Sequence, residues 1–161
     1  YLAIVEGHVR DETFTVDAPI AEGTDLIRVA VRIDRQAGKP ARTDFQVLRR
    51  FECDGAPFSL LRCHPQTGRQ HQIRIHAQFA GFSLVGDKMY GPDPLFFDRF
   101  SKGCLEPEAW QRLRLSRHAL HAARITLMHP VMKKPVTFKS PLPSDMAEFV
   151  FGGNPSHTSP Y

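Results

Sequence analysis

The side chains that could do chemistry are concentrated in residues 67–76, which read Thr-Gly-Arg-Gln-His-Gln-Ile-Arg-Ile-His. At about one hundred degrees per residue, Arg74 lies in the middle of a polar helical arc that carries amides and His71 but no acid. Polar faces of surface helices usually pair Lys with Glu one turn away. An Arg without a local carboxylate suits a more distant anion, either a carboxylate elsewhere in the fold or a phosphate. A solvated Arg on an ordinary helix is the alternative interpretation.

A helix must present this run, and we predict it from about residue 69 to residue 80. Thr67 would cap its first turn, and Gly81 would follow its last residue in a left-handed conformation. The apolar segment before the run, residues 58–63, is typical of a strand. We therefore expect a strand, a turn at Pro65-Gln66 and then the helix.

The remaining chain alternates strand patterns with turns, and short helices follow in its second half. Asp54-Gly55 marks a hairpin turn, residues 19–23 form the expected loop, and Val136 and Phe138 are expected to face inward. Strands are predicted at residues 1–7, 13–17, 25–33, 43–51, 57–64, 117–128 and 133–140, and helices at residues 95–100, 107–115 and 143–150.

The composition is that of one ordinary soluble globular domain. The 161 residues are 42% hydrophobic and 24% charged, and no apolar run is long enough to span a membrane. The net charge is +4, and 15 of the 21 basic residues are Arg, which suits contacts with phosphates and bases. This charge fits a nucleic-acid partner, and it fits a merely basic protein equally well. Three cysteines without zinc-ribbon spacing indicate reduced thiols and a cytoplasmic location.

Eight His residues raise the question of a metal site. His71 and His76 fall on different arcs of the predicted helix, and His118 and His121 point to opposite faces of a predicted strand. No Cys-x-x-Cys pair supplies further ligands. We therefore predict no metal site, and a metal-dependent hydrolase remains the alternative that metal analysis would test.

Residues 67–76, followed by Gly81 and by Val-Gly-Asp-Lys-Met-Tyr-Gly at residues 85–91, resemble the RluA-type RNA pseudouridine synthases over about 25 positions. The Tyr-x-Ala-x-Val-x-Gly strand that begins at Tyr1 and the Leu-His-Ala strand that begins at Leu120 resemble the same family. The resemblance implies an α+β domain at residues 1–150, with a mostly antiparallel mixed sheet and short flanking helices. It leaves residues 151–161 as a C-terminal tail.

The resemblance also implies an activity, the isomerisation of uridines in ribosomal or transfer RNA to pseudouridine, without cofactor or metal. The family flips the target base out of the RNA and uses one Asp as its essential catalytic group. Arg74 would hold that carboxylate ionised, Tyr1 would stack against the base, and Leu120 would form a wall of the active site. We expect a monomer that binds RNA through Arg62, Arg69, Gln70, His71, Lys88 and Arg117.

The Asp motif of the family is not found in this chain. Residues 32–38, Arg-Ile-Asp-Arg-Gln-Ala-Gly, are similar to it, but they follow the Tyr1 strand, whereas the motif precedes that strand in the family. We therefore interpret Asp34 as a turn residue. Because the chain begins at Tyr1 inside a predicted strand, we expect a fragment whose catalytic Asp lies upstream and which is inactive alone. The alternative is a non-catalytic RNA-binding remnant of the same fold.

Overall fold

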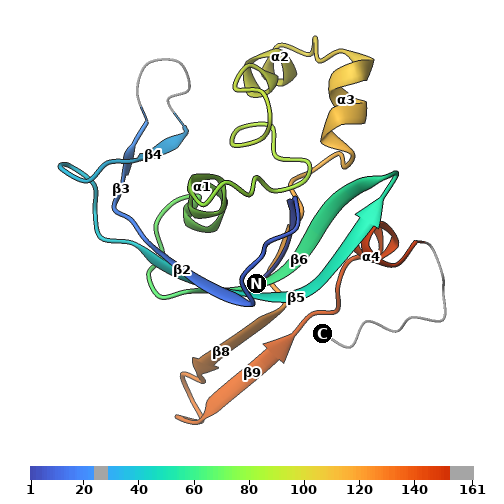
Figure 1. The fold of residues 1–161 in the computed structure, drawn as a ribbon. Helices are drawn as coiled ribbons and strands as arrows, with labels where there is room; N and C mark the ends of the chain where they lie inside the picture. Colours follow the sequence, from blue (N-terminus) through green and yellow to red (C-terminus); the bar gives the residue numbers. More distant parts are fainter. Residues whose placement is uncertain (24–28, 153–161) are drawn as a thin grey trace.

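The long apolar segments form a five-stranded sheet in the computed structural model, which describes residues 1–23 and 29–152. Figure 1 shows the sheet curving beneath helix α1 (Gln72–Phe79). Every strand pairing in the described residues is antiparallel. The predicted α+β class with a mostly antiparallel sheet is therefore confirmed. In spatial order the strands are β2 (Thr13–Asp17), β5 (Arg42–Cys53), β6 (Ala56–Pro65), β1 (Leu2–Glu6) and β7 (Leu120–His121).

The hairpin of β5 and β6 forms the centre of this sheet. Its turn residues, Asp54 and Gly55, have φ angles of 50° and 71°, the two positive values that a two-residue type I′ turn requires. The ladder runs from the pair Cys53–Ala56 beside the turn to the pair Thr43–Pro65 at the far end. The predicted turn is therefore confirmed, and both strands extend beyond their predicted limits.

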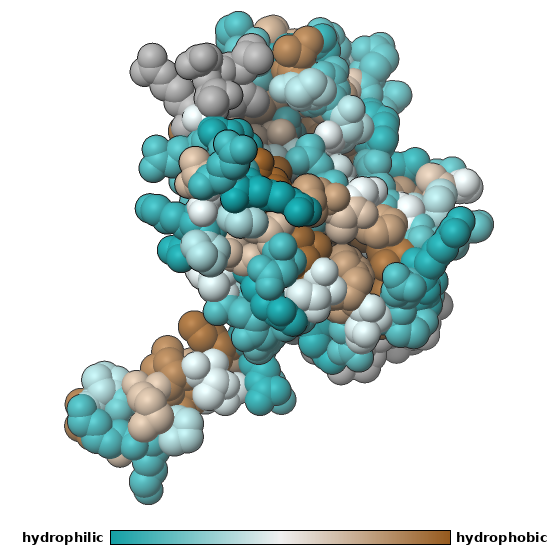
Figure 2. Space-filling model, turned by 60° about the vertical axis from the view of Figure 1, so that its left-hand side comes forward, coloured by the Kyte–Doolittle hydropathy of each residue, from teal (hydrophilic) through white to brown (hydrophobic). Residues whose placement is uncertain are grey.

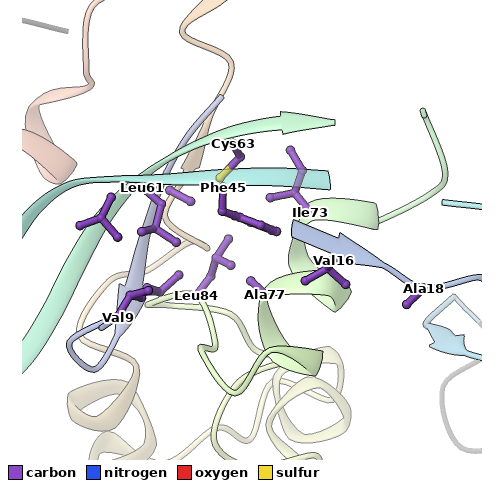
Figure 3. Packing of buried hydrophobic residues seen from close by; sticks show 12 residues of the cluster. Val9, Val16, Ala18, Phe45, Leu61, Cys63, Ile73, Ala77 and Leu84 are labelled. Atoms are coloured by element: carbon purple, nitrogen blue, oxygen red, sulfur yellow. The ribbon is translucent and has the colours of Figure 1, made fainter. Parts of the chain in front are cut away.

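One face of the sheet is covered by α1, because side chains alternate between the two faces along each strand. Phe45, Leu61 and Cys63 point toward the helix and share a buried cluster with Ile73 and Ala77 (Figure 3). Leu61 and Ala77 are 0% exposed, so this contact between the helix and the sheet is closed to bulk solvent. Burial of this apolar surface is the main contribution that holds α1 on the sheet.

The opposite face of the sheet is covered by α4 (Ser144–Phe151). Met146 is 0% exposed and belongs to a cluster with Phe58 and Leu60 of β6. The predicted C-terminal helix is confirmed. Most of the predicted tail, residues 153–161, lies outside the described residues.

Two short strands form a separate hairpin beside α1 (Figure 1), β3 (Ile20–Glu22) and β4 (Val31–Ile33). The predicted loop over residues 19–23 is therefore wrong, because Ile20 is buried and pairs with Ile33. The predicted strand over residues 25–33 is found only at its end. Residues 24–28, which hold its first part, lie outside the described residues.

A second hairpin projects from the body of the molecule as an arm (Figures 1 and 2), and consists of β8 (Arg124–Met128) and β9 (Pro135–Lys139). Ile125 lies opposite Phe138 and Leu127 opposite Val136, so four apolar side chains share one face. Ile125 and Phe138 are 57% and 56% exposed. The prediction that Phe138 faces inward is wrong, because the hairpin leaves the main sheet after β7 and pairs with no other described strand.

Two short helices, α2 (Phe96–Ser101) and α3 (Pro107–Leu113), connect the turn at residues 86–91 to β7. Phe96 packs against Ala109 and Leu113, and Pro107 begins α3 as predicted. None of the helices in the described ranges combines the length and the apolar content needed to cross a bilayer.

The turn at residues 86–91 requires a glycine at its start. Gly86 has a φ of 74°, and a Cβ atom there would lie 2.0 Å from the carbonyl oxygen of Arg117. Gly81, which follows α1 as predicted, has a φ of 89°, but a Cβ atom there would meet open space. Both glycines therefore have a left-handed backbone, but only Gly86 is also closely packed against another segment.

We expect Gly86→Ala to destabilise the protein more than Gly81→Ala. Both substitutions place a side chain in the left-handed region, at about 1–2 kcal/mol. Only Gly86→Ala must also displace the backbone at Arg117, which adds roughly 1–3 kcal/mol. Denaturant unfolding of the two variants measures the difference, and equal losses would contradict the close approach at Gly86.

Candidate active site

The segment that leads into α1 is held by one buried amide side chain. Gln72 Oε1 accepts hydrogen bonds from the Thr67 hydroxyl at 2.7 Å and from the Arg69 N–H at 3.0 Å. Gln72 Nε2 donates to the Arg42 carbonyl oxygen at 2.9 Å and to the Thr43 hydroxyl at 3.0 Å. The helix begins at Gln72 instead of residue 69, and the prediction that Thr67 caps it is wrong, because the Thr67 hydroxyl is turned to the Gln72 amide.

His76 continues this network through the core. Its imidazole is 0% exposed, with Nδ1 2.9 Å from Thr43 Oγ1 and Nε2 3.0 Å from the Ala18 carbonyl oxygen. Because a carbonyl only accepts, Nε2 carries the proton and Nδ1 accepts from Thr43. Burial lowers the pKa of His76, which favours this neutral ring. The helical periodicity placed His76 on a different arc from His71 but could not identify its partners.

Arg74 is paired, and its partner is Asp87. Nε donates to Oδ2 at 2.7 Å and Nη2 donates to Oδ1 at 2.8 Å, while the Asp87 side chain is 0% exposed. Asp87 Oδ1 also accepts the N–H groups of Met89 and Tyr90, so the same carboxylate closes this turn. The prediction that the anion of Arg74 is missing from the chain is wrong, because the turn that follows α1 supplies the carboxylate.

Arg74 keeps Asp87 ionised. Burial by itself acts to raise the pKa of Asp87, but the hydrogen bonds and charge of Arg74, together with two backbone N–H donors, lower the pKa below its ordinary value. The Arg74 guanidinium carbon also lies 4.9 Å from the centre of the Tyr90 ring. The pair therefore holds the middle of α1 against the turn that carries Tyr90.

An open cleft of about 340 Å³ lies at the N-terminal end of α1. Five predicted site residues line it, from three distant segments: Tyr1 at the start of β1, Leu120 in β7, and Arg69, His71 and Arg74 in and before α1. The sheet order β6-β1-β7 brings the first two together. Among the described residues that line the cleft, none is Asp or Glu.

Arg69 borders the cleft with an open guanidinium group. Its Nε donates to the Pro40 carbonyl oxygen at 3.1 Å, and the side chain is exposed. Within the part of the chain that the structure describes, no carboxylate forms an ion pair with Arg69. The charge of Arg69 is therefore available for a further anion, whereas the charge of Arg74 is already paired with Asp87.

Comparison with known proteins identifies the family. A family model described as RNA pseudouridylate synthase matches residues 1–79. The chain is 36% identical over 150 residues to the uncharacterized RNA pseudouridine synthase YlyB of Bacillus subtilis, across 93% of this chain and 42% of that protein. It is 40% identical over 151 residues to the ribosomal large subunit pseudouridine synthase D of Nitrosomonas europaea, across 91% of this chain and 38% of that protein. The chain belongs to the RluA-type RNA pseudouridine synthases.

Solved structures agree with this RluA-type assignment. The human RNA pseudouridylate synthase domain containing 1 superimposes with a TM-score of 0.67 at 28% identity, across 87% of this chain and 52% of that chain. The human RNA pseudouridylate synthase domain containing 4 superimposes with a TM-score of 0.61 at 24% identity, which supports the fold alone. The chain spans about two fifths of the length of the curated relatives that it matches.

Two residues that the family resemblance assigned to RNA binding have partners within the protein. Lys88 Nζ lies 4.8 Å from the ring centres of both Phe100 and Trp110, and it donates to the Ser116 carbonyl oxygen at 2.6 Å. Arg117 donates to the Asp145 carboxylate at 2.8 Å and so holds α4. Neither residue lines the cleft of this synthase-family chain, because Lys88 contacts α2 and α3 and Arg117 contacts α4.

Arg62 and Gln70, which were also assigned to RNA, remain exposed. Arg62 donates to Gln46 at 2.8 Å and lies on the sheet face opposite α1, because its neighbours Leu61 and Cys63 face the helix. Gln70 lines a second hollow of about 570 Å³, between the start of α1 and the β3–β4 hairpin. Of these two residues, only Gln70 therefore lies beside the cleft.

Two further features concern titratable side chains. His118 lines the cleft, and the family resemblance did not assign it to the site although it lies two residues before Leu120. Asp34 accepts the N–H groups of Gln36 and Ala37, which confirms its interpretation as a turn residue. Among the described residues, no group of three or more His, Cys, Asp and Glu side chains is placed to hold a metal ion.

Arg74→Met is expected to destabilise the protein by about 3–5 kcal/mol, because it leaves the Asp87 charge buried and unpaired. For a domain of this size the melting temperature should fall by roughly 6–20 °C. Lys102→Met, which removes an exposed pair with Asp98, should cost at most about 1 kcal/mol. Circular dichroism melting of the three proteins tests this, and an unchanged melting temperature for Arg74→Met would contradict the structural role.

The same pair predicts a loss of stability in acid. The pKa of Asp87 is lower in the folded protein than the ordinary value of about 3.9, so its contribution is present above that value and is lost as the pH falls through the folded pKa. Asp87→Asn should therefore show a flatter decline of melting temperature below about pH 5 than the unmodified protein. The two proteins have all their other carboxylates in common, so the difference between the two curves of melting temperature against pH gives the contribution of Asp87. Parallel curves would contradict the prediction.

Proposed function

We propose that this chain forms the substrate-binding part of an RNA pseudouridine synthase that isomerises uridines in ribosomal or transfer RNA. The observation that carries the proposal is the convergence of Tyr1, Leu120 and Arg69 on one cleft. Family membership supports it, and several relatives are named for the ribosomal large subunit. We also propose a monomer in the cytoplasm, with which the free thiols of Cys53 and Cys63 are consistent.

The reaction exchanges one bond of the ribose for another. The C1′–N1 glycosidic bond breaks, the detached uracil rotates, and a C1′–C5 bond forms. The hydrogen on C5 leaves as a proton and N1 gains a proton, so neither an oxidant nor a reductant is consumed. The site must therefore supply a carboxylate, a surface that holds the extruded base, and donors that fix its orientation.

Each of these needs has a candidate at the cleft. The ring of Tyr1, 44% exposed, offers a stacking surface for the base, and Leu120 offers an aliphatic wall beside it. The open guanidinium of Arg69 would pair with a catalytic carboxylate and keep it ionised. We assign that carboxylate to a segment that precedes Tyr1 in the whole protein, as the family motif implies. Arg74 acts as a positioning residue through Asp87.

The RNA backbone is proposed to pass from the cleft into the second hollow. That hollow adjoins the cleft through Gly68 and Arg69, which line both. Lys39 lies along it, and its charge suits contacts with phosphates, whereas Arg32, which also lines it, is paired with Asp34 at 2.7 Å. The flanking nucleotides would therefore lie between the β3–β4 hairpin and the start of α1.

The second candidate function is RNA binding without catalysis. One observation favours it, the lack of an Asp or Glu among the described residues that line the cleft. Both candidates share the same RNA-binding surface, so binding measurements alone would not separate them. Turnover separates them.

The decisive measurement is tritium release from ribosomal and transfer RNA transcripts that carry 5-tritiated uridine, with the whole protein that contains this chain. We expect release, because C5 loses its hydrogen only when the C1′–C5 bond forms. Arg69→Met should reduce the rate of release by about 100-fold or more, since it removes the charge beside the carboxylate. No release from any of these RNAs, together with retained binding, would establish the second candidate instead.

Arg62→Met is the matched control for Arg69→Met. Both residues are exposed Arg side chains, so neither substitution should change the unfolding free energy by more than about 0.5 kcal/mol. Arg62 lies outside the cleft, so its loss should leave the release rate within severalfold of the unmodified value. Equal losses of rate for the two variants would contradict the specific role of Arg69.

A further inference from the structure

His71 is connected to the β3–β4 hairpin through one buried hydroxyl group. The Tyr90 hydroxyl oxygen lies 3.1 Å from His71 Nδ1 and accepts the Val31 N–H at 2.7 Å. Tyr90 is 4% exposed, and its ring meets the imidazole edge to face at 5.7 Å. The hydroxyl group therefore joins β4 to the residue that opens α1.

This arrangement determines which nitrogen of His71 carries the proton. Because the Tyr90 oxygen already accepts from Val31, its own proton needs an acceptor, and His71 Nδ1 is the only group that the described contacts offer. A buried hydroxyl proton without an acceptor is strongly disfavoured. Nδ1 is therefore the acceptor, and Nε2 carries the N–H of the neutral ring.

The surroundings of the ring favour this neutral form. Burial lowers the pKa of His71, and the charge of Arg74 lowers it further, against the opposing charge of Asp87. The charge of His118, which lines the same cleft, also acts to lower the pKa of His71. The imidazole therefore presents an uncharged donor at neutral pH.

The backbone of His71 is held in an unfavourable conformation. Its φ and ψ are 52° and 18°, in the left-handed region, and its side chain does not cap the helix. Conformations of this kind persist where the surrounding structure imposes them, and they are frequent at functional sites. Within the described residues, Nε2 has no hydrogen-bond partner, although the side chain lines the cleft between Arg69 and Arg74.

We propose that His71 Nε2–H donates a hydrogen bond to a carbonyl oxygen of the uracil bound in the cleft, and that Tyr90 is the positioning residue that sets this donor. The inference rests on the proposed function, because it assumes that the cleft holds a uridine. A neutral donor matches the neutral carbonyl groups of uracil. A phosphate would instead favour the charged imidazolium, and the exposed guanidinium of Arg69 suits it better.

Nitrogen-15 NMR of the histidine rings, in the whole protein that contains this chain, tests the proposal without turnover. We expect the neutral Nε2–H tautomer for His71, and a mixture of tautomers after Tyr90→Phe, which keeps the ring but removes the hydroxyl. Uridine should shift the Nε2 signal, whereas 4-thiouridine and 2-thiouridine serve as probes in which one carbonyl oxygen is a poor acceptor. One of the two thio-probes should lose the shift, which identifies the carbonyl.

Protonation of His71 Nδ1 in the protein without bound uridine would overturn the proposal. A shift with inorganic phosphate equal to that with uridine would also overturn it, because the donor would then bind a phosphate. If uridine shifts the NMR signals of Tyr1 and Leu120 but not those of His71, the inference is wrong and the proposed function is unaffected. If the whole protein releases no tritium but uridine still shifts the His71 signal, the proposed catalytic function is wrong and the hydrogen bond from His71 is supported.

His71→Asn provides the binding test, because Asn tolerates the left-handed backbone and does not reach as far as Nε2. We expect its dissociation constant for uridine to rise by about three- to tenfold, the effect of one lost neutral hydrogen bond. Gln78→Asn, on an exposed position of the same helix outside the cleft, is the matched control and should leave the constant unchanged. An unchanged constant for His71→Asn would contradict the contact.

Discussion

The buried ion pair of Arg74 and Asp87 is the interaction on which the site depends. It joins the middle of α1 to the turn at residues 86–91, and the same carboxylate closes that turn by accepting two backbone N–H groups. Neither charge can be removed alone without leaving the other uncompensated in the interior. That turn also holds Tyr90 beneath the Arg74 guanidinium and beside His71. One ion pair therefore sets the relative positions of the helix, the turn and one wall of the cleft.

The helix itself docks on the sheet through polar as well as apolar contacts. Gln72, Arg74 and His76, at alternate positions, are all buried, and no buried side-chain nitrogen or oxygen among the described residues lacks a partner. Apolar packing alone would tolerate small shifts of a helix along a sheet, but directional hydrogen bonds to Thr43 and Ala18 define one position. The residues that precede the helix and line the cleft are therefore placed by a rigid element.

Two Arg residues five positions apart illustrate how burial divides the roles of similar side chains. Arg74 is largely enclosed, and one edge of its guanidinium, formed by Nε and Nη2, pairs with the Asp87 carboxylate, so it contributes to the fold. Arg69 precedes the helix, where the backbone has not yet entered the sheet–helix interface, and it stays exposed with donors free toward the cleft. The sequence motif contains both residues, and it does not distinguish the buried Arg from the open one.

Local signals in the sequence determined a large part of this protein. The Asp54-Gly55 turn, the left-handed Gly81 that follows α1 and the family motif depend on backbone conformation or on neighbouring residues, and all three are borne out. Tertiary structure alone decided the partner of Arg74, the start of α1 at Gln72 and the exposure of Phe138. A helical wheel contains only the residues of its own helix, so it cannot show a carboxylate that returns from the next turn. These contacts depend on which distant segments meet in space, and that is settled only when the whole sheet is assembled.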